Sequence, residues 1–165
     1  MDEVWFIVSP QNPFKEKDNL IPEKHRFRMV EIAVENMPNV KACDIEFSMP
    51  LPSYTIDTLK LLEKEHPGIT FHILMGNDNI ILIKRWKDAD SIMNDYHKLV
   101  YPRNGYPVNE KQLPPKTKLS GAPMIDISST MLREWLSGGH NIRAFLPAGV
   151  YDYIISNGLY IKHFN

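Results

Sequence analysis

The apolar residues of this chain fall into short blocks whose spacing alternates between strand-like and helix-like. The continuous apolar run at residues 4–8 is typical of a strand buried on both faces, and it stops at Ser9-Pro10. Further strands are predicted at residues 40–47, 69–75 and 98–101, with a broken one within 117–127. Helical spacing, with Pro or Gly at the ends, predicts helices at residues 22–37, 53–66, 78–95, 128–136 and 147–158.

Strands that alternate with helices over the whole length predict an α/β fold, a parallel sheet with helices on both faces. The length of 165 residues matches one domain, so we expect residues 1–165 to form a single domain. Ligands of such sheets bind beyond the carboxyl ends of the strands. We expect the polar segments that follow the candidate strands to gather there: residues 9–15, 53–57, 76–78, 102–106 and 127–133.

Charge and composition limit the possible partners. The 19 basic and 20 acidic residues give a net charge of −1, so neither nucleic acid nor a membrane surface is a predicted partner. The single cysteine, Cys43, excludes an internal disulfide and indicates a reducing compartment. No apolar run reaches the roughly 20 residues that span a bilayer, and the first residues lack a signal-peptide pattern. We therefore predict a cytoplasmic protein.

Several common nucleotide and metal motifs are absent from the sequence. There is no Gly-x-x-x-x-Gly-Lys-Ser/Thr phosphate loop and no Gly-x-Gly-x-x-Gly dinucleotide motif. The six histidines have no spacing to carboxylates or cysteines that predicts a metal site held by the protein. Any anion must therefore be held by a local cluster of other donors.

The most informative polar stretch is ISSTMLR at residues 127–133. Hydroxyl groups at a helix N-terminus, together with free backbone N–H groups, favour binding of an anion such as phosphate. Arg133, one turn after Ser129, could grip the same anion with its planar guanidinium. A plain helix cap at Ser128 or Ser129, with Arg133 in solvent, is the more common arrangement for this local pattern.

A second basic group consists of Lys15, Arg26 and Arg28. These three side chains could hold a phosphate, but a solvated helix face is favoured by their spacing alone. Further along, Gly76-Asn77-Asp78 at a strand end could let the backbone approach a ribose whose hydroxyls donate to Asp78. A plain Asp helix cap explains that pattern equally well.

Aromatic residues near these segments allow stacking on a flat ring. Trp86 and Tyr106 are the candidates, although a tryptophan in a globular protein more often belongs to the core.

Taken in order, these segments resemble the nicotinate-nucleotide adenylyltransferase family of the nucleotidylyltransferase superfamily, which has a Rossmann-like fold. The combination of SYTIDTL at 53–59 with ISSTMLR at 127–133 is the most specific part of the resemblance. The other matching stretches are VWFIVSPQNPFK at 4–15, HRFRMVEIA at 25–33, MGNDN at 75–79, RW at 85–86, YPRNGY at 101–106 and VYDYIISNGLY at 150–160.

The resemblance implies transfer of AMP from ATP to nicotinate mononucleotide, with release of pyrophosphate, as a step of NAD biosynthesis. It also implies a role for each matching residue. Lys15 and Arg26 would hold phosphates, and Arg103 would lie at the nucleotide crevice. Along the pyridine mononucleotide would lie Ser53, Tyr54, Thr55 and, stacked near the ring, Trp86. The ATP ribose would meet Gly76 and Asp78, and the ATP phosphates would be gripped by Ser128, Ser129 and Arg133. Mg²⁺ is expected to arrive with ATP, because the sequence shows no metal-ligand cluster.

The sequence departs from the family pattern in two places. Phe14 stands where many members have a histidine before the lysine. More importantly, the family's first strand, its His-x-Gly-His loop and the following helix have no counterpart before Val4. We therefore name no catalytic residue in the chain and expect little activity of the chain as written, with activity returning when that segment is restored.

The missing segment also leads to a structural expectation and to two alternative functions. We expect an unpaired edge beside the strand at residues 4–8, which a second copy of the chain could fill as a homo-oligomer. The alternative functions are an adenylyltransferase for another phosphate acceptor, such as phosphopantetheine, and a non-catalytic nucleotide-binding remnant. SYTIDTL and Trp86 favour the pyridine nucleotide over phosphopantetheine.

Overall fold

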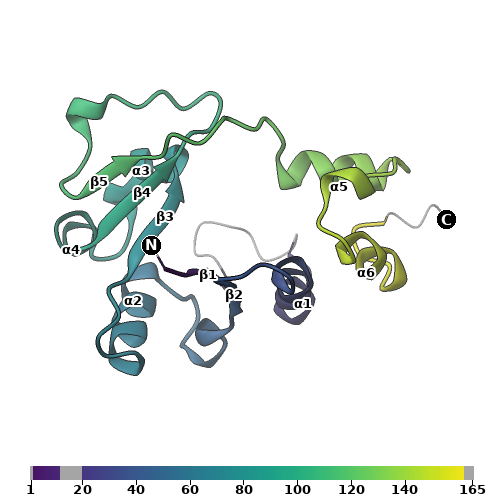
Figure 1. The fold of residues 1–165 in the computed structure, drawn as a ribbon, viewed down its shortest axis with the longest axis horizontal. Coiled ribbons are helices and arrows are strands. Elements are labelled where there is room, and N and C mark those ends of the chain that lie inside the picture. Colours follow the sequence, from purple (N-terminus) through teal and green to yellow (C-terminus); the bar gives the residue numbers. More distant parts are fainter. Residues whose placement is uncertain (1, 12–19, 162–165) are drawn as a thin grey trace. The chain divides into compact units, whose positions relative to one another are not determined.

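The computed structural model describes residues 2–11 and 20–161, which form two compact units (Figure 1). The first unit contains residues 1–53 and 127–165, and the second contains residues 54–126. Both units combine parallel strands with helices, so the predicted α/β class is confirmed. That the two units belong to one domain stays a prediction.

The first unit contains a parallel strand pair and three helices. Strand β1 (Val4–Ile7) pairs with β2 (Val40–Cys43), and the connection between them contains α1 (Glu23–Val34). Helices α5 (Ser129–Ser137) and α6 (Val150–Ser156) follow late in the chain. Within the described residues β1 pairs with β2 alone, so the expected unpaired edge of β1 is present.

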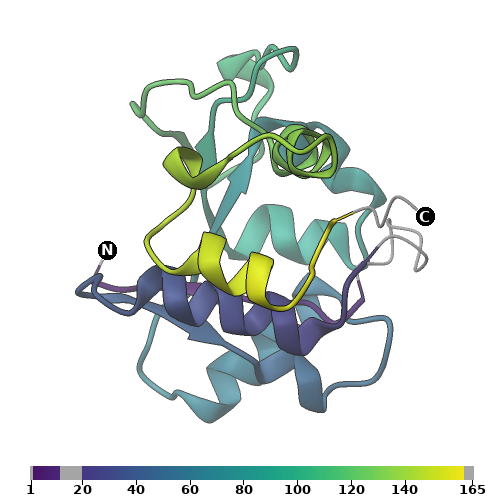
Figure 2. The same cartoon turned by 90° about the vertical axis from the view of Figure 1, so that its right-hand side faces the viewer.

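The core of the first unit lies where α1 meets the C-terminal helices. Its buried residues are Leu136, Ile142, Val150, Ile154 and Leu159, and residues of α1 such as Ile32 pack against them. Figure 2 shows α6 lying alongside α1. Gly149, at φ 82° just before α6, makes this approach possible, because a Cβ there would lie 2.9 Å from the Ile32 side chain.

The second unit contains a parallel sheet in the order β3 (His72–Gly76), β4 (His97–Tyr101), β5 (Thr117–Leu119). Three helices accompany it: α2 (Thr55–Glu65), α3 (Asn77–Leu82) and α4 (Ala89–Asp95). The apolar stripe of α2 enters the core, which is why a helix forms here despite its charged residues. The buried core residues are Ile56, Leu59, Met75, Ile80, Ile83, Ile92, Tyr96 and Val100.

A buried lysine near the start of β4, Lys98, binds the end of α4. The Lys98 side chain is only 2% exposed, and its ammonium donates to the carbonyl oxygens of Ile92, Met93 and Tyr96 at 3.1, 2.7 and 2.7 Å. These carbonyls belong to the C-terminal end of α4, where helical partners run out. Burial, followed by the charge of Lys116, lowers the pKa of the Lys98 amine.

One predicted strand is wrong over half of its length. Residues 40–47 were expected to be extended, but the strand ends at Cys43 and a 3₁₀ helix, η2 (Ile45–Ser48), follows. The physical reason is Glu46, whose buried carboxylate accepts a hydrogen bond from the Ser53 hydroxyl at 2.5 Å. A short helix turns this side chain inward, and the pairing offsets the cost of burying a carboxylate.

Other boundaries differ less. The last strand is shorter than the predicted 117–127 segment, and the region 78–95 contains α3, a 3₁₀ turn η3 (Ile83–Arg85) and α4. None of the helices in the described part of the chain has the length and apolar character needed to cross a bilayer.

Candidate functional site

Four segments of the chain carry the residues proposed for binding: the α2 N-terminus with Trp86, the β3–β4 edge, the loop after β1, and the α5 N-terminus. The first two lie in the second unit, apart from Ser53, and the other two lie in the first.

The N-terminus of α2 is preceded by two residues with different surroundings. Ser53 is 6% exposed and its hydroxyl donates to Glu46, so this side chain is already engaged within the protein. Tyr54 precedes the helix without a side-chain cap, and its carbonyl accepts from the amides of Asp57 and Thr58. The amides of Thr55 and Ile56, which precede these bonds, have no partner within the helix. They are donors of the kind that favour an anion.

Trp86, which the resemblance assigns to the same ligand as Tyr54, also lies close to α2 in the structure. Its indole is half-buried and packs against the same core cluster as the Tyr54 ring. The neighbouring Lys87 ammonium lies 4.8 Å from the centre of the Tyr54 ring and 2.7 Å from an Asp57 oxygen. The structure therefore brings Tyr54 and Trp86 together on one cluster, although the indole also has the core role that a tryptophan commonly has.

The carboxyl end of β3 lies against the loop that follows β4. A Cβ at Gly76 would collide with an Asp78 carboxylate oxygen and lie 2.7 Å from the Arg103 Nε, so a larger residue would displace these two side chains. Asp78 and Arg103 form an ion pair with an N–O distance of 3.4 Å. Gly76 is the residue before α3 and no side chain caps that helix, so the plain helix-cap role considered for Asp78 is wrong.

The sequence patterns assigned no role to Asn77, which the structure places between the end of β3 and the loop that follows β4. It is 7% exposed, and its side chain accepts from the Arg103 amide at 2.8 Å and donates to the Tyr106 carbonyl at 2.6 Å. These bonds tie the 102–106 loop to the end of β3. The signal in the sequence was an amide residue between Gly76 and Asp78, but its partners lie 26 and 29 residues away.

A cavity of about 380 Å³ opens beside this loop. Among its lining residues are Arg103, Tyr106, Ser120 and Met124, from the segments that follow β4 and β5. The Ser120 Oγ is buried and has no hydrogen-bond partner among the described residues. The carboxyl edge of this sheet therefore has a cavity that the Arg103 guanidinium and polar groups line, and two of the five polar segments expected at such an edge, 76–78 and 102–106, meet there.

In the loop after β1, Arg26 makes contacts that its spacing did not reveal. Its guanidinium donates to the carbonyls of Ser9 at 2.6 Å, Pro10 at 2.9 Å and Ile21 at 3.2 Å. Each guanidinium nitrogen thus has one backbone partner, and two N–H groups are left for a ligand. Arg28 pairs with Glu31 on the exposed helix face, so the solvated alternative is confirmed for this residue. Lys15 and Phe14 lie outside the described residues.

The N-terminus of α5 has the cap that its sequence predicts. The Ser128 hydroxyl accepts from the Met131 amide at 3.1 Å, and Ser129 is the first helical residue. Arg133 donates to the Thr130 hydroxyl at 3.1 Å, and its guanidinium carbon lies 5.8 Å from the centre of the Tyr160 ring. The plain cap is therefore present, and the exposed hydroxyls and Arg133 remain available to an anion.

Metal-binding side chains do not gather anywhere in the described ranges. No group of three His, Cys, Asp or Glu residues that could hold an ion occurs within residues 2–11 and 20–161.

Comparison with known proteins identifies the family. A relative from Bacteroides fragilis, named "Probable nicotinate-nucleotide adenylyltransferase", is 43% identical over 155 residues, which are 94% of this chain and 77% of the relative. The chain belongs to the nicotinate-nucleotide adenylyltransferase family. A Flavobacterium johnsoniae relative with the same name is 38% identical over 98% of this chain and 85% of its own. The family model described as cytidylyltransferase-like matches residues 1–135 of this adenylyltransferase chain.

Solved structures confirm the fold of this family member. The nicotinic acid mononucleotide adenylyltransferase of Plasmodium falciparum, complexed with NaAD, superposes with a TM-score of 0.81 at 24% identity. The match covers 97% of this chain and 83% of that protein. The predicted Rossmann-like α/β fold is therefore confirmed, and the relatives above confirm the family resemblance.

Proposed function

We propose that this protein transfers AMP from ATP to nicotinate mononucleotide, giving nicotinate adenine dinucleotide and pyrophosphate in NAD biosynthesis. The observation that carries the proposal is the 43% identity to a relative of that name over 94% of the chain. The P. falciparum structures, described as complexes with NaAD and with APC, support nucleotide substrates for this fold.

The chemistry required is a displacement at phosphorus. A phosphate oxygen of nicotinate mononucleotide forms a bond to the α-phosphorus of ATP, and the bond from that phosphorus to the β-phosphate bridging oxygen breaks. Pyrophosphate leaves with the electron pair, so no covalent enzyme intermediate is needed. Rate enhancement then comes from aligning the two phosphates and from cations that neutralise the developing charge.

We assign the pyridine mononucleotide to the α2 N-terminus. The ring would stack near Trp86 and lie along Ser53, Tyr54 and Thr55, supported by the free first-turn amides and by the shared core cluster of Tyr54 and Trp86. Its phosphate would be held by Lys15 and Arg26.

We assign ATP to the strand ends and the α5 N-terminus. Asp78 would accept from the ribose hydroxyls over Gly76, where no side chain blocks the backbone, and Arg103 would contribute charge at the crevice. Ser128, Ser129 and Arg133 would bind the phosphates through hydroxyls, amides and the guanidinium.

The divalent cation in this proposal is Mg²⁺, bound mainly by the ATP phosphates. This fits the described residues, among which Asp78 is paired with Arg103 and no three His, Cys, Asp or Glu side chains lie close enough to hold a metal ion. When bound, the cation neutralises phosphate charge. A cytoplasmic location and self-association through the free edge of β1 complete the proposal.

The test is pyrophosphate release by the purified protein with ATP, Mg²⁺ and nicotinate mononucleotide, with mass spectrometry of the product. Formation of nicotinate adenine dinucleotide supports the proposal. Turnover with phosphopantetheine in place of the pyridine nucleotide, or nucleotide binding without any turnover even when the family's N-terminal segment is restored, would replace it with one of the two alternatives.

A further inference from the structure

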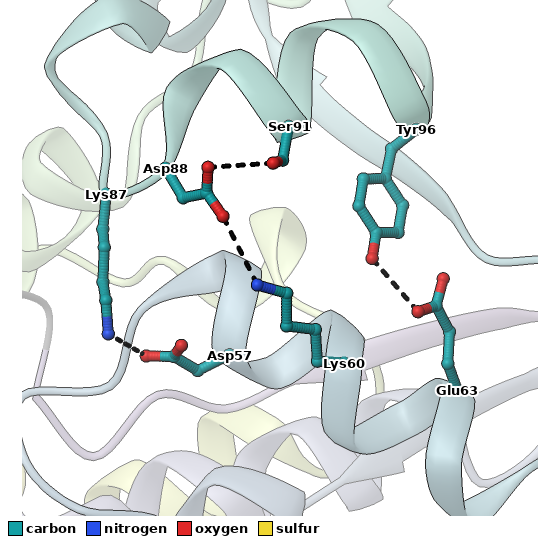
Figure 3. Close-up of polar contacts among 7 residues, drawn as sticks. All are labelled: Asp57, Lys60, Glu63, Lys87, Asp88, Ser91 and Tyr96. Carbon is teal, nitrogen blue, oxygen red and sulfur yellow. Dashed lines mark hydrogen bonds and ion pairs between the residues drawn. The ribbon is translucent and has the colours of Figure 1, made fainter.

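Helix α2 presents a row of charged side chains along one face. Asp57, Lys60 and Glu63 are three residues apart, which places them one above another along the helix. Figure 3 shows all three reaching toward partners in the segment from Lys87 to Tyr96. This segment starts directly after Trp86 and includes α4.

Each member of the row has its own partner, and the charges alternate. Asp57 accepts from Lys87 at 2.7 Å, and Lys60 donates to Asp88 at 3.3 Å. The Glu63 carboxylate accepts from the Tyr96 hydroxyl at 3.1 Å. If the segment slid along α2 so that each residue met the next partner, Asp57 would face Asp88 or Lys60 would face Lys87. Repulsion between these like charges therefore disfavours such a shifted pairing.

The middle contact also fixes the backbone turn into α4. Asp88 has a left-handed conformation with φ 50° and ψ 47°, which is unfavourable for residues other than glycine and is tolerated best by Asn and Asp. Its carboxylate accepts from the Ser91 hydroxyl at 2.8 Å as well as from Lys60, and these two bonds lower the pKa of Asp88. The turn between Trp86 and α4 is therefore held in one conformation from both sides.

The first contact differs from the other two in what lies beside it. Lys87 follows Trp86 in the chain, and its ammonium covers the Tyr54 ring while binding Asp57. Tyr54 and Trp86 are the two aromatic residues that the proposed function places along the pyridine mononucleotide. The second and third contacts join α2 to α4 further from these residues.

We propose that the Lys87–Asp57 ion pair is a positioning device for the pyridine mononucleotide, holding the Tyr54 ring and the Trp86 segment in the orientation that the ligand requires. Lys87 acts through these two aromatic residues and does not itself bind the ligand. The proposal rests on the proposed function for the identity of the ligand, but its structural part does not.

The test variant is Lys87→Met, which keeps the length and the apolar stem of the side chain and removes the charge. The matched control is Lys60→Met, which removes the same charge from the neighbouring contact. Lys87→Arg is the conservative variant that retains both the ion pair and the contact with the ring. Calorimetry gives the dissociation constants for nicotinate mononucleotide, nicotinamide mononucleotide and ATP, and thermal unfolding reports on folding.

For Lys87→Met we expect about fivefold weaker binding of the pyridine mononucleotide. This is the size of effect expected when an exposed ion pair and a cation–π contact are lost together. ATP binding should stay within about twofold, Lys60→Met should bind both ligands nearly as the parent does, and Lys87→Arg should restore most of the affinity. Equal weakening for ATP, or equal effects of Lys87→Met and Lys60→Met, would overturn the proposal. So would a loss confined to nicotinate over nicotinamide mononucleotide, because it would show direct binding of the carboxylate by Lys87.

A second measurement needs no ligand. In a Trp5→Phe/Trp135→Phe background Trp86 is the only tryptophan of the chain. Lys87→Met should then make Trp86 fluorescence more accessible to acrylamide, and Lys60→Met should not. Absence of pyridine mononucleotide binding by the parent, with this fluorescence difference intact, would refute the proposed function. Binding by the parent with no effect of Lys87→Met on affinity or fluorescence would refute the positioning role alone.

Discussion

Replacing Lys98 by methionine tests whether the hydrogen bonds of a buried ammonium stabilise the fold by more than its desolvation destabilises it. The three hydrogen bonds of the ammonium to the carbonyls of Ile92, Met93 and Tyr96 would each contribute roughly 1.5–3 kcal/mol as bonds to a charged group. Burying the charge costs several kcal/mol. The difference predicts that Lys98→Met, which keeps the apolar stem, lowers the free energy of unfolding by about 2–4 kcal/mol.

Urea-induced unfolding measures this loss, and thermal unfolding should show it as a fall of roughly 4–16 °C in Tm. Lys118→Met is the control, because Lys118 is an exposed lysine on the neighbouring strand β5 and its loss should change stability by less than about 0.5 kcal/mol. Unchanged or increased stability of Lys98→Met would show that the desolvation cost exceeds the three bonds, and the reasoning would fail.

The same residue predicts a dependence on pH with a definite sign. Burial lowers the Lys98 pKa in the folded state below its usual value of 10.5, so just below pH 10.5 the unfolded chain binds more protons than the folded chain. Stability from this group therefore rises with pH through that window. The free-energy difference between the parent and Lys98→Met should grow as pH is raised toward 10.5, and a difference that shrinks would contradict the assignment.

Three other substitutions test separate contacts. Asn77→Ala should cost about 2 kcal/mol in urea unfolding and expose the 102–106 loop to proteolysis, because buried loop groups lose their partner; an equally protected loop would show that Asn77 is not its anchor. Burial and the Glu63 charge raise the pKa of Tyr96 to about 12. The contribution of Tyr96 to the free energy of unfolding is therefore fully present below pH 10 and is lost as the pH rises through 12. Glu63→Gln should lower the Tyr96 pKa, as measured by ultraviolet titration. Arg26→Ala should weaken nicotinate mononucleotide binding by about 1.5–3 kcal/mol, the range for a hydrogen bond to a charged group. It should also lower Tm, because the guanidinium binds backbone carbonyls. If calorimetry shows unchanged affinity for both Arg26→Ala and Trp86→Ala, the assigned pyridine nucleotide site is refuted.

The sequence predicted those parts of the fold that depend on local periodicity. The strand at residues 4–8 and the helix after Pro22 are predicted from the spacing of neighbouring apolar residues, without reference to the rest of the fold. The structure confirms both, with small differences in where they begin and end. The error at residues 40–47 arose because Glu46 is buried and accepts a hydrogen bond from Ser53, seven residues further on. A pattern of neighbouring residues contains no signal for such a partner.

The candidate site was predictable to a similar extent. The helix cap at Ser128 follows from the local pattern of hydroxyl residues, and the structure contains it. The parts that stayed hidden are partnerships across the fold, such as Lys87 with Asp57 over a separation of 30 residues. Such pairs depend on how α2 meets α4, which is decided by the apolar core beneath them.

Arg26, Asn77 and Lys98 share a chemical role in holding segments of the chain where regular secondary structure ends. Each is a polar side chain that donates to backbone carbonyls of an irregular segment: the loop after β1, the loop after β4, and the end of α4. Irregular segments leave carbonyls without ladder or helix partners, and water would otherwise satisfy them. Internal donors remove that dependence on water and fix the backbone, so a ligand meets amides and charges that are already oriented. Arg26, which the sequence offers as a substrate-binding residue, therefore acts first on the chain itself, and ligand-contacting groups should be sought among the donors that these bonds leave free.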